Sequence, residues 1–294
     1  MSRIDQIFSR LRAKGERALV AYFTAGDPSV EVTEKVVCAA VENGADLIEL
    51  GFPFSDPLAD GPVIQRASQR ALQHGMNFER LIRLIELLRA RVQAPLVVMT
   101  YVNPILRRGG GVIAKDLVQA GLDGLIIPDL PPDESGELGK ALRQSGLDLI
   151  YLAAPTSSPE RLRLIARRSQ GFIYLVSLTG VTGARDQLPP DLIQHLRDLR
   201  AVTKKPICVG FGISTPEHAR VVGEWADGVV VGSAIVRLIE EHASSPDLIR
   251  RVGHFIQSLK APLESRGSGS GARGSQNTKS DPGPRTPDPG PPTP

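Results

Sequence analysis

Short apolar runs alternate with amphipathic helical stretches along most of the chain. Several runs are continuously apolar and rich in Val, Ile and Leu, which is typical of parallel strands buried on both faces. Between the runs, apolar residues recur at helical spacing, as in "ERLIRLIELLRARV" (79–92) and "SPERLRLIARRS" (158–169). Strand starts recur about every 30 residues, the size of a strand–helix unit. The eight runs are residues 18–23, 46–50, 95–99, 124–128, 148–153, 172–177, 206–211 and 228–232.

This rhythm predicts an α/β fold of the (β/α)8 TIM barrel class. A doubly wound open sheet shares the local pattern, but it less often has eight uniform units, and no GxGxxG motif follows the first run. Ser158 and Gly171 are residue types that begin and end helices, which supports the helix at 158–169. Four apolar residues predict a short amphipathic N-terminal helix that caps the barrel: Ile4, Ile7, Phe8 and Leu11.

Composition changes abruptly near residue 263. The chain as a whole is 41% hydrophobic and 23% charged, which is enough apolar material for a large core. Residues 263–294, however, have almost no large apolar side chains and are crowded with Gly, Pro and Ser. Such a segment cannot bury enough surface to offset its ordering entropy. We therefore predict a barrel domain at 1–262 and a disordered tail at 263–294, the alternative for the tail being a basic nucleic-acid arm.

Charge and cysteine content exclude several classes of protein. The net charge of +3 is too small to indicate a nucleic-acid surface. Cys38 and Cys208 stand in unrelated contexts, so neither a disulfide framework nor a zinc cluster is expected. The first 20 residues lack the apolar core of a signal peptide, and no apolar run is long enough to span a membrane. We predict a cytoplasmic protein with no bound metal and no nucleic-acid or membrane partner.

A carboxylate ends the second apolar run, in the segment "IELGFPFSDPLADGP" (48–62). Since barrel sites lie where strands end, Glu49 is expected to point into the barrel mouth. Partial desolvation there would raise its pKa towards neutrality, which suits a group that gives and takes protons. A structural ion pair is the alternative, although no apolar run carries a basic residue. Asp60 can reach the same pocket from the loop, or it can cap the helix beginning at Pro62.

Glycines mark the last three strand ends, in "GVTGA", "GFGIS" and "VGSAIV". Barrels commonly bind phosphate after strands 7 and 8, where backbone N–H groups and a helix N-terminus face the anion. Any one of these glycines could instead shape a tight turn. Together they predict a phosphorylated ligand near Thr182, Gly183, Gly210, Gly212, Gly232 and Ser233.

The long segment "LIELGFPFSDPLADGPVIQRA" resembles the signature of the tryptophan synthase alpha subunit family. The similarity continues through "FTAGDP", "MTYVNP", "IPDLPPDES", "YLVSLTGVTG", "VGFGIS" and "VGSAIV", and spans about residues 4–261. It implies retro-aldol cleavage of indole-3-glycerol phosphate to indole and glyceraldehyde 3-phosphate. It also implies an alpha2-beta2 tetramer, with no cofactor in this subunit and pyridoxal phosphate in the beta subunit.

The resemblance assigns roles to individual residues. It implies that Glu49 is the general acid and base, that Asp60 accepts a hydrogen bond from the indole N–H, and that Tyr174 lies near the glycerol chain. From the sequence alone, Tyr174 could equally fill the core. The implied phosphate site is Gly183, Gly212, Gly232 and Ser233. The implied indole pocket is Tyr22, Met99, Tyr101, Ile126 and Phe211. The resemblance also implies that Thr182 belongs to a mobile loop that closes over the substrate. The implied partner contacts are Asp56, Pro57, Asn103 and Pro131.

Two positions depart from the family pattern. Tyr22 stands where Phe is familiar and adds a hydroxyl that needs a partner, and Leu178 stands where some members carry Arg. Two other functions share parts of the site. A stand-alone lyase that releases free indole would have the same active site, and a non-catalytic phosphate-binding barrel would need neither Glu49 nor Asp60.

Overall fold

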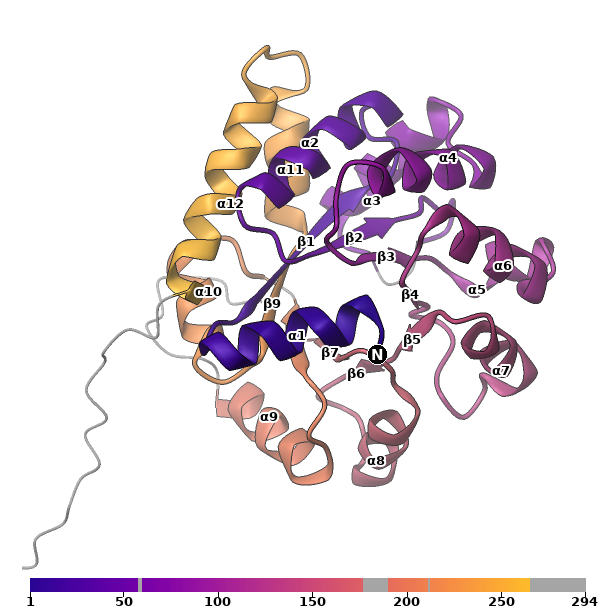
Figure 1. Cartoon of the computed structure of the whole chain (residues 1–294), viewed down its shortest axis with the longest axis vertical. Helices are drawn as coiled ribbons and strands as arrows, with labels where there is room; N and C mark the ends of the chain where they lie inside the picture. Colours follow the sequence, from indigo (N-terminus) through magenta and orange to yellow (C-terminus); the bar gives the residue numbers. More distant parts are fainter. Residues whose placement is uncertain (58–59, 177–189, 211, 265–294) are drawn as a thin grey trace, which may run out of the picture.

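The strands of the protein form one parallel sheet that curls into a barrel surrounded by helices (Figure 1). The computed structural model describes residues 1–57, 60–176, 190–210 and 212–264. Neighbouring strands follow the order β5-β4-β3-β2-β1-β9-β8-β7-β6. The predicted TIM barrel class is confirmed. The strands are β1 (Ala18–Thr24), β2 (Leu47–Gly51), β3 (Leu96–Met99), β4 (Gly124–Ile126), β5 (Asp148–Ile150), β6 (Leu152–Ala153), β7 (Ile173–Val176), β8 (Ile207–Gly210) and β9 (Gly228–Val231).

Helices connect successive strands and cover the outside of the barrel (Figure 1). The stretch predicted at 79–92 forms α4, and the one at 158–169 forms α8, whose first turn is capped by the Ser158 hydroxyl. The helices of the described residues are α1 (Arg3–Lys14), α2 (Val30–Glu42), α3 (Pro62–Gln73), α4 (Phe78–Arg89), α5 (Val102–Arg107), α6 (Gly110–Ala120), α7 (Gly136–Gln144), α8 (Pro159–Arg168), α9 (Pro190–Val202), α10 (Pro216–Gly223), α11 (Ser233–His242) and α12 (Leu248–Glu264). Among these, none is both long and apolar enough to cross a membrane.

One apolar run, 148–153, was predicted as a single strand, and that prediction is wrong. The run divides at Tyr151 into β5, which pairs with β4, and β6, which pairs with β7. The Tyr151 carbonyl accepts from the N–H of Tyr174, 3.2 Å away. Closing a barrel tilts and staggers its strands, so pairing partners can change within one run. Here that change falls at Tyr151, and eight runs give nine strands.

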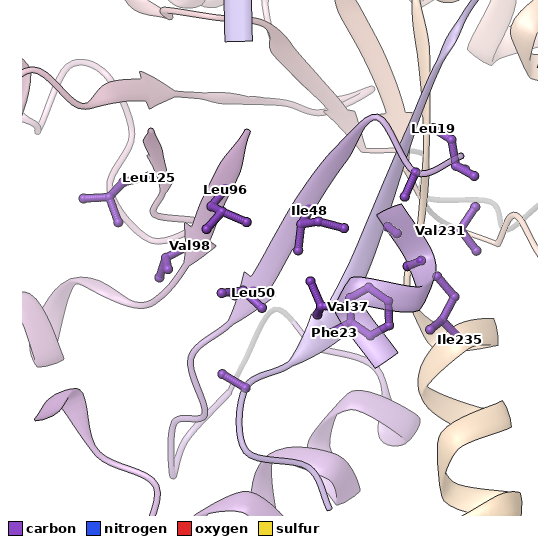
Figure 2. Packing of buried hydrophobic residues seen from close by; sticks show 14 of the residues in the cluster. Leu19, Phe23, Val37, Ile48, Leu50, Leu96, Val98, Leu125, Val231 and Ile235 are labelled. Atoms are coloured by element: carbon purple, nitrogen blue, oxygen red, sulfur yellow. The ribbon is translucent and has the colours of Figure 1, made fainter. Parts of the chain in front are cut away.

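Alternation along the strands sends one set of side chains outward to the helices. Ile48 and Leu50 of β2 lie in the same outer layer as Leu96 and Val98 of β3 (Figure 2). Helix residues such as Val37 and Ile235 complete this layer, which is the main core of the protein. Because neighbouring positions in a strand point to opposite faces, the residue between Ile48 and Leu50 points into the barrel. That residue is Glu49.

Helix α1 closes the N-terminal end of the barrel, as the amphipathic pattern predicts. Its four apolar residues, Ile4, Ile7, Phe8 and Leu11, pack against Val20 of β1, Leu47 of β2 and Phe172, which directly precedes β7. Phe8 and Phe172 bring their ring centroids to 5.8 Å. At the start of α1, the Ser2 hydroxyl donates to Asp148 at 2.6 Å and Arg3 pairs with Asp123 at 2.9 Å. The opposite, carboxyl end of the strands is left for the site.

The last helix, α12, is held to the N-terminal end of the barrel by a buried ion pair. Lys260 Nζ lies 2.8 Å from Asp46 Oδ2, and the two side chains are 5% and 8% exposed. Asp46 also accepts from the N–H of Leu19, and Lys260 donates to the carbonyl of Arg17. Burial raises the pKa of Asp46, and the Lys260 charge opposes that rise. Helix α12 runs two residues past the predicted boundary at 262, and the division into barrel and tail stays a prediction because residues 265–294 lie outside the described ranges.

Replacing Lys260 by Met should destabilise the protein by about 3–5 kcal/mol, because Asp46 would keep a buried charge without its cation. Urea unfolding measures the change. The double variant Lys260→Met/Asp46→Asn is the matched control, since the amide oxygen can still accept from the N–H of Leu19 without a charge. It should be clearly more stable than the single variant. If the single and the double variant were equally stable, the loss in Lys260→Met would not come from an unpaired charge on Asp46.

Candidate active site

Glu49 is the central residue of β2, and its side chain points into the barrel. It faces Tyr22 of β1 on one side and Val97 of β3 on the other in the strand register. The residue is 1% exposed, and within the described residues its Oε2 atom has no hydrogen-bond partner. No positive charge acts on it there, so the ion-pair alternative is not supported. Glu49 is therefore a buried acid for which the described part of the chain supplies no cation.

The pKa of Glu49 is raised from 4.5 to about 8, first by burial and then by the negative charge of Asp60. Burial also raises the pKa of Asp60, to about 6, while a hydrogen bond from the Tyr101 hydroxyl opposes that rise. At neutral pH the pair thus consists of a protonated Glu49 and a mostly ionised Asp60. Two carboxyl groups held in different charge states can divide the work of proton donation and charge stabilisation.

Asp60 reaches the site from the loop before α3, as one of the two predictions for this residue states. The other prediction, that it caps α3, is wrong. The N-cap residue is Gly61, and no side chain caps this helix. Instead, Asp60 is half-buried and bonded to Tyr101. The Tyr101 ring stacks on Phe54 with centroids 5.1 Å apart.

Two tyrosines, Tyr22 of β1 and Tyr174 of β7, lie close to the acids. Each is 7% exposed, and each hydroxyl lies over a glycine of the next strand. A Cβ atom at Gly51 would collide with the Tyr22 hydroxyl, and one at Gly210 would collide with that of Tyr174. Burial chiefly raises the pKa of both phenols, to which the charges of Glu49 and Asp60 add. Both phenols therefore stay protonated beside the acids.

The other predicted pocket residues in the described ranges also lie on the inner side of the barrel. Met99, at the end of β3, is half-buried and pairs in register with Ile126 of β4. Ile126 is fully buried among the residues of the inner core. Tyr22 contacts apolar residues of two helices, among them Ala67 of α3 and Val236 of α11. Phe211 lies outside the described residues.

The predicted phosphate residues within the described ranges follow the carboxyl ends of β8 and β9. Gly232 is the N-cap residue of α11 and Ser233 is the exposed first residue of that helix. Gly212 follows β8 with a φ of 74°, a conformation that favours glycine. Backbone N–H groups at the start of α11 can thus face an anion. Gly183, Thr182 and Leu178 lie outside the described residues.

The predicted partner contacts follow strands at the same end of the barrel, three of them on loops and Asn103 in α5. Asp56 and Asn103 are exposed, and Pro57 and Pro131 are half-buried. These segments follow β2, β3 and β4, and the Val102 N–H at the start of α5 donates to Asp129 of the loop after β4 at 2.9 Å. No group of His, Cys, Asp and Glu in the described ranges could hold a metal ion.

Sequence reasoning missed the contacts that hold Asp60. Tyr101 was placed in the indole pocket, but its hydroxyl bonds to Asp60, and no pattern links two residues on different loops. Phe54 was not singled out, although it stands in the signature segment next to the acids. Neither did the sequence point to the ion pair between Asp27, on the loop after β1, and Arg70 of α3.

Comparison with known proteins decides the family. The model of the family "Tryptophan synthase alpha chain" matches residues 8–262. This chain belongs to the tryptophan synthase alpha chain family. It is 49% identical over 260 residues to the tryptophan synthase alpha chain of Geobacter sp. (strain M21), covering 88% of this chain and 97% of that one. The identity to the alpha chain of Carboxydothermus hydrogenoformans is 46% over 265 residues, covering 89% and 99%.

Solved structures of the tryptophan synthase alpha chain family share the fold. The alpha subunit from Legionella pneumophila str. Paris superposes with a TM-score of 0.83 at 39% identity, covering 90% of this chain and 99% of that chain. A chain of the Mycobacterium tuberculosis tryptophan synthase in its aminoacrylate-bound form gives 0.80 at 35% identity, covering 90% and 100%. Alpha chains of this family are lyases that cleave indole-3-glycerol phosphate, need no cofactor and work with a beta subunit that holds pyridoxal phosphate. The predicted family is confirmed.

The raised pKa of Glu49 predicts a pH-dependent effect of Glu49→Gln on stability. Since the folded-state pKa of about 8 exceeds the ordinary 4.5, the native state keeps a proton that the unfolded chain releases. Stability associated with Glu49 is therefore lost as pH rises from about 4.5 to 8. Glu49→Gln should gain on the wild type, by on the order of 2–4 kcal/mol between pH 5 and pH 9.

Chemical denaturation at the two pH values measures this gain. Glu137→Gln, on an exposed position of α7, removes the same charge from the surface and should show no such gain. A difference between Glu49→Gln and the wild type that is the same at both pH values would contradict a raised pKa at Glu49.

Proposed function

We propose that this chain cleaves indole-3-glycerol phosphate to indole and glyceraldehyde 3-phosphate, with Glu49 as general acid and base. The observation that carries the proposal is the state of Glu49 itself. It is a buried carboxyl in β2 without a cationic partner among the described residues, and its pKa is raised to about 8 beside Asp60. A general acid–base group works best with a pKa near the working pH. A barrel that only held a phosphate would have no use for it.

The retro-aldol step needs two proton transfers. A proton is added to C3 of the indole ring, and the hydroxyl on the adjacent side-chain carbon loses its proton. The bond between C3 and that carbon then breaks, its electron pair returns to the ring, and the carbon leaves as an aldehyde. Glu49 starts protonated at neutral pH, so it can donate to C3 and, as carboxylate, accept the hydroxyl proton.

We assign Asp60 to binding the indole ring of the substrate. Its carboxylate would accept a hydrogen bond from the indole N–H and oppose the positive charge that forms when C3 is protonated. The bond from Tyr101 supports this role because it favours the ionised form of Asp60. Tyr174, whose phenol lies within electrostatic reach of Glu49, is assigned to the glycerol chain.

We assign the indole pocket to Tyr22, Met99, Tyr101, Ile126 and Phe211. The phosphate is assigned to the backbone at Gly183, Gly212, Gly232 and Ser233, for which the N-terminus of α11 supplies positive potential. Thr182 is assigned to the loop that closes over substrate.

We infer that a beta subunit docks on the segments that carry Asp56, Pro57, Asn103 and Pro131. Their place at the mouth of the barrel suits a protein that passes indole to its partner. Turnover that rises when a beta subunit is added would support this, and unchanged turnover would favour the stand-alone lyase. The cytoplasmic location stays a prediction.

Glu49→Gln should reduce indole release by at least about 10²- to 10⁴-fold, because one group makes both proton transfers. Asp60→Asn should lose less, since the amide oxygen can still accept from the indole N–H but lacks the charge. Single-turnover indole release measures both effects. Binding of glycerol phosphate is the control, and it should survive because neither acid is assigned to the phosphate. Near-wild-type release by Glu49→Gln would refute the mechanism.

Gly232→Ala tests the phosphate assignment. A Cβ atom at this position would make ordinary contact with Tyr22, at 3.4 Å, so the fold should accept it. The added methyl group would occupy space at the start of α11 where the anion approaches. We expect about tenfold weaker binding of glycerol phosphate, measured by calorimetry, with the melting temperature nearly unchanged. Wild-type affinity would place the phosphate elsewhere.

A further inference from the structure

Two arginines of α3, Arg66 and Arg70, both bind the carboxylate of Glu240, and Arg70 also binds that of Asp27. Arg66 donates twice to Glu240 of α11, at 2.9 and 2.7 Å, and Arg70 donates to the same carboxylate at 2.6 Å. With its Nε and Nη2 atoms, Arg70 also forms two bonds of 2.8 Å to Asp27. Arg70 therefore connects α3 with α11 and with the loop that follows β1.

In this ion-pair cluster of Arg66, Arg70, Asp27 and Glu240, the groups around Arg70 are largely removed from solvent. The Asp27 side chain is 3% exposed, and those of Arg70 and Glu240 are 28% and 25% exposed. The hydrogen bonds from Arg66 are the largest cause of a Glu240 pKa lowered to about 2, so this carboxylate is ionised at neutral pH. Isolated surface pairs add little to stability, whereas bidentate guanidinium–carboxylate bonds fix direction as well as distance.

Both helices joined by the cluster carry parts of the proposed site. Helix α3 begins at Pro62, two residues after Asp60. Helix α11 begins at Ser233, next to Gly232, where we place the phosphate. The position of α3 relative to α11 therefore sets the distance between the Asp60 carboxylate and the phosphate anchor. A substrate held at both ends must match that distance.

On their inner side the two helices meet through apolar contacts. Val63, Ile64 and Ala67 of α3 and Val236 of α11 pack around Tyr22. Such contacts are non-directional, so they hold the helices together but resist sliding along the helix axes poorly. Arg66 and Arg70 lie one turn apart on α3 and hold one carboxylate of α11, which opposes that sliding.

We propose that Arg70 is a positioning residue that fixes the span between Asp60 and the phosphate anchor through Asp27 and Glu240. The inference rests on the proposed lyase function. Arg70 touches no substrate group in this assignment and acts only through the two helices and the β1 loop.

The test compares Arg70→Lys with Arg89→Lys. Arg89 is a matched control because it is also a sheltered arginine paired with a buried carboxylate, Asp123, at 2.7 Å, but at the N-terminal end of the barrel. Lysine keeps the charge and loses the bidentate geometry. Three quantities are measured for each variant and the wild type: kcat/KM for indole-3-glycerol phosphate, affinity for inorganic phosphate, and unfolding by urea.

We expect Arg70→Lys to lose about tenfold in kcat/KM, because small misplacements of a reacting group are costly. Its affinity for inorganic phosphate should stay within about twofold of the wild type. This split is expected because inorganic phosphate occupies only one end of the span. Arg89→Lys should change the urea midpoint and leave both functional quantities within about twofold.

Unchanged kcat/KM in Arg70→Lys would overturn the inference. So would an equal loss of phosphate affinity, which would mean that the cluster only shapes the anion site. If Arg70→Lys does not fold, Glu240→Gln replaces it, since the Asp27–Arg70 pair remains there, and the same two outcomes decide. A wild-type protein that releases no indole would instead overturn the proposed function, so the two failures are distinguishable.

Discussion

The direction of the Glu49 side chain is the constraint on which the site depends. Ile48 and Leu50 must face the helices because they belong to the main core, and strand alternation then turns Glu49 into the barrel. Inside, α1 and its apolar partners close the N-terminal end. The acid is thus excluded from water by the same packing that stabilises the barrel. The first cause of its raised pKa is therefore the burial that the fold imposes.

Asp60 is a second carboxyl group beside Glu49, and the two differ in charge state at neutral pH. Its negative charge raises the pKa of Glu49 further, while its own ionised form is favoured by Tyr101. Repulsion between the two carboxyl groups keeps a proton on Glu49, the more buried one. The protein holds these groups together although their proximity destabilises the doubly ionised pair, which is the kind of strain that folds retain at active sites.

The order of strands and helices could be predicted from the sequence because alternating buried runs and helical periods are local patterns. Glu49 could be placed for the same reason, since strand parity is local too. Contacts between loops, in contrast, are not determined by local sequence. The Tyr101–Asp60 bond and the Arg70 cluster depend on how far each loop reaches after the barrel closes, and no spacing encodes that. The division of one run at Tyr151 was missed because strand stagger is a property of the closed sheet.

Tyr22 shows how the scaffold and the site share one residue. Its ring packs against α3 and α11, and its hydroxyl lies over Gly51 near both acids. A phenylalanine would make the same apolar contacts, so the helices do not require the hydroxyl. Because the phenol is buried, it stays protonated, so its hydroxyl can donate one hydrogen bond and also accept from another donor. The hydroxyl therefore makes the wall of the site more polar beside Glu49, while the ring maintains the contact between the two helices.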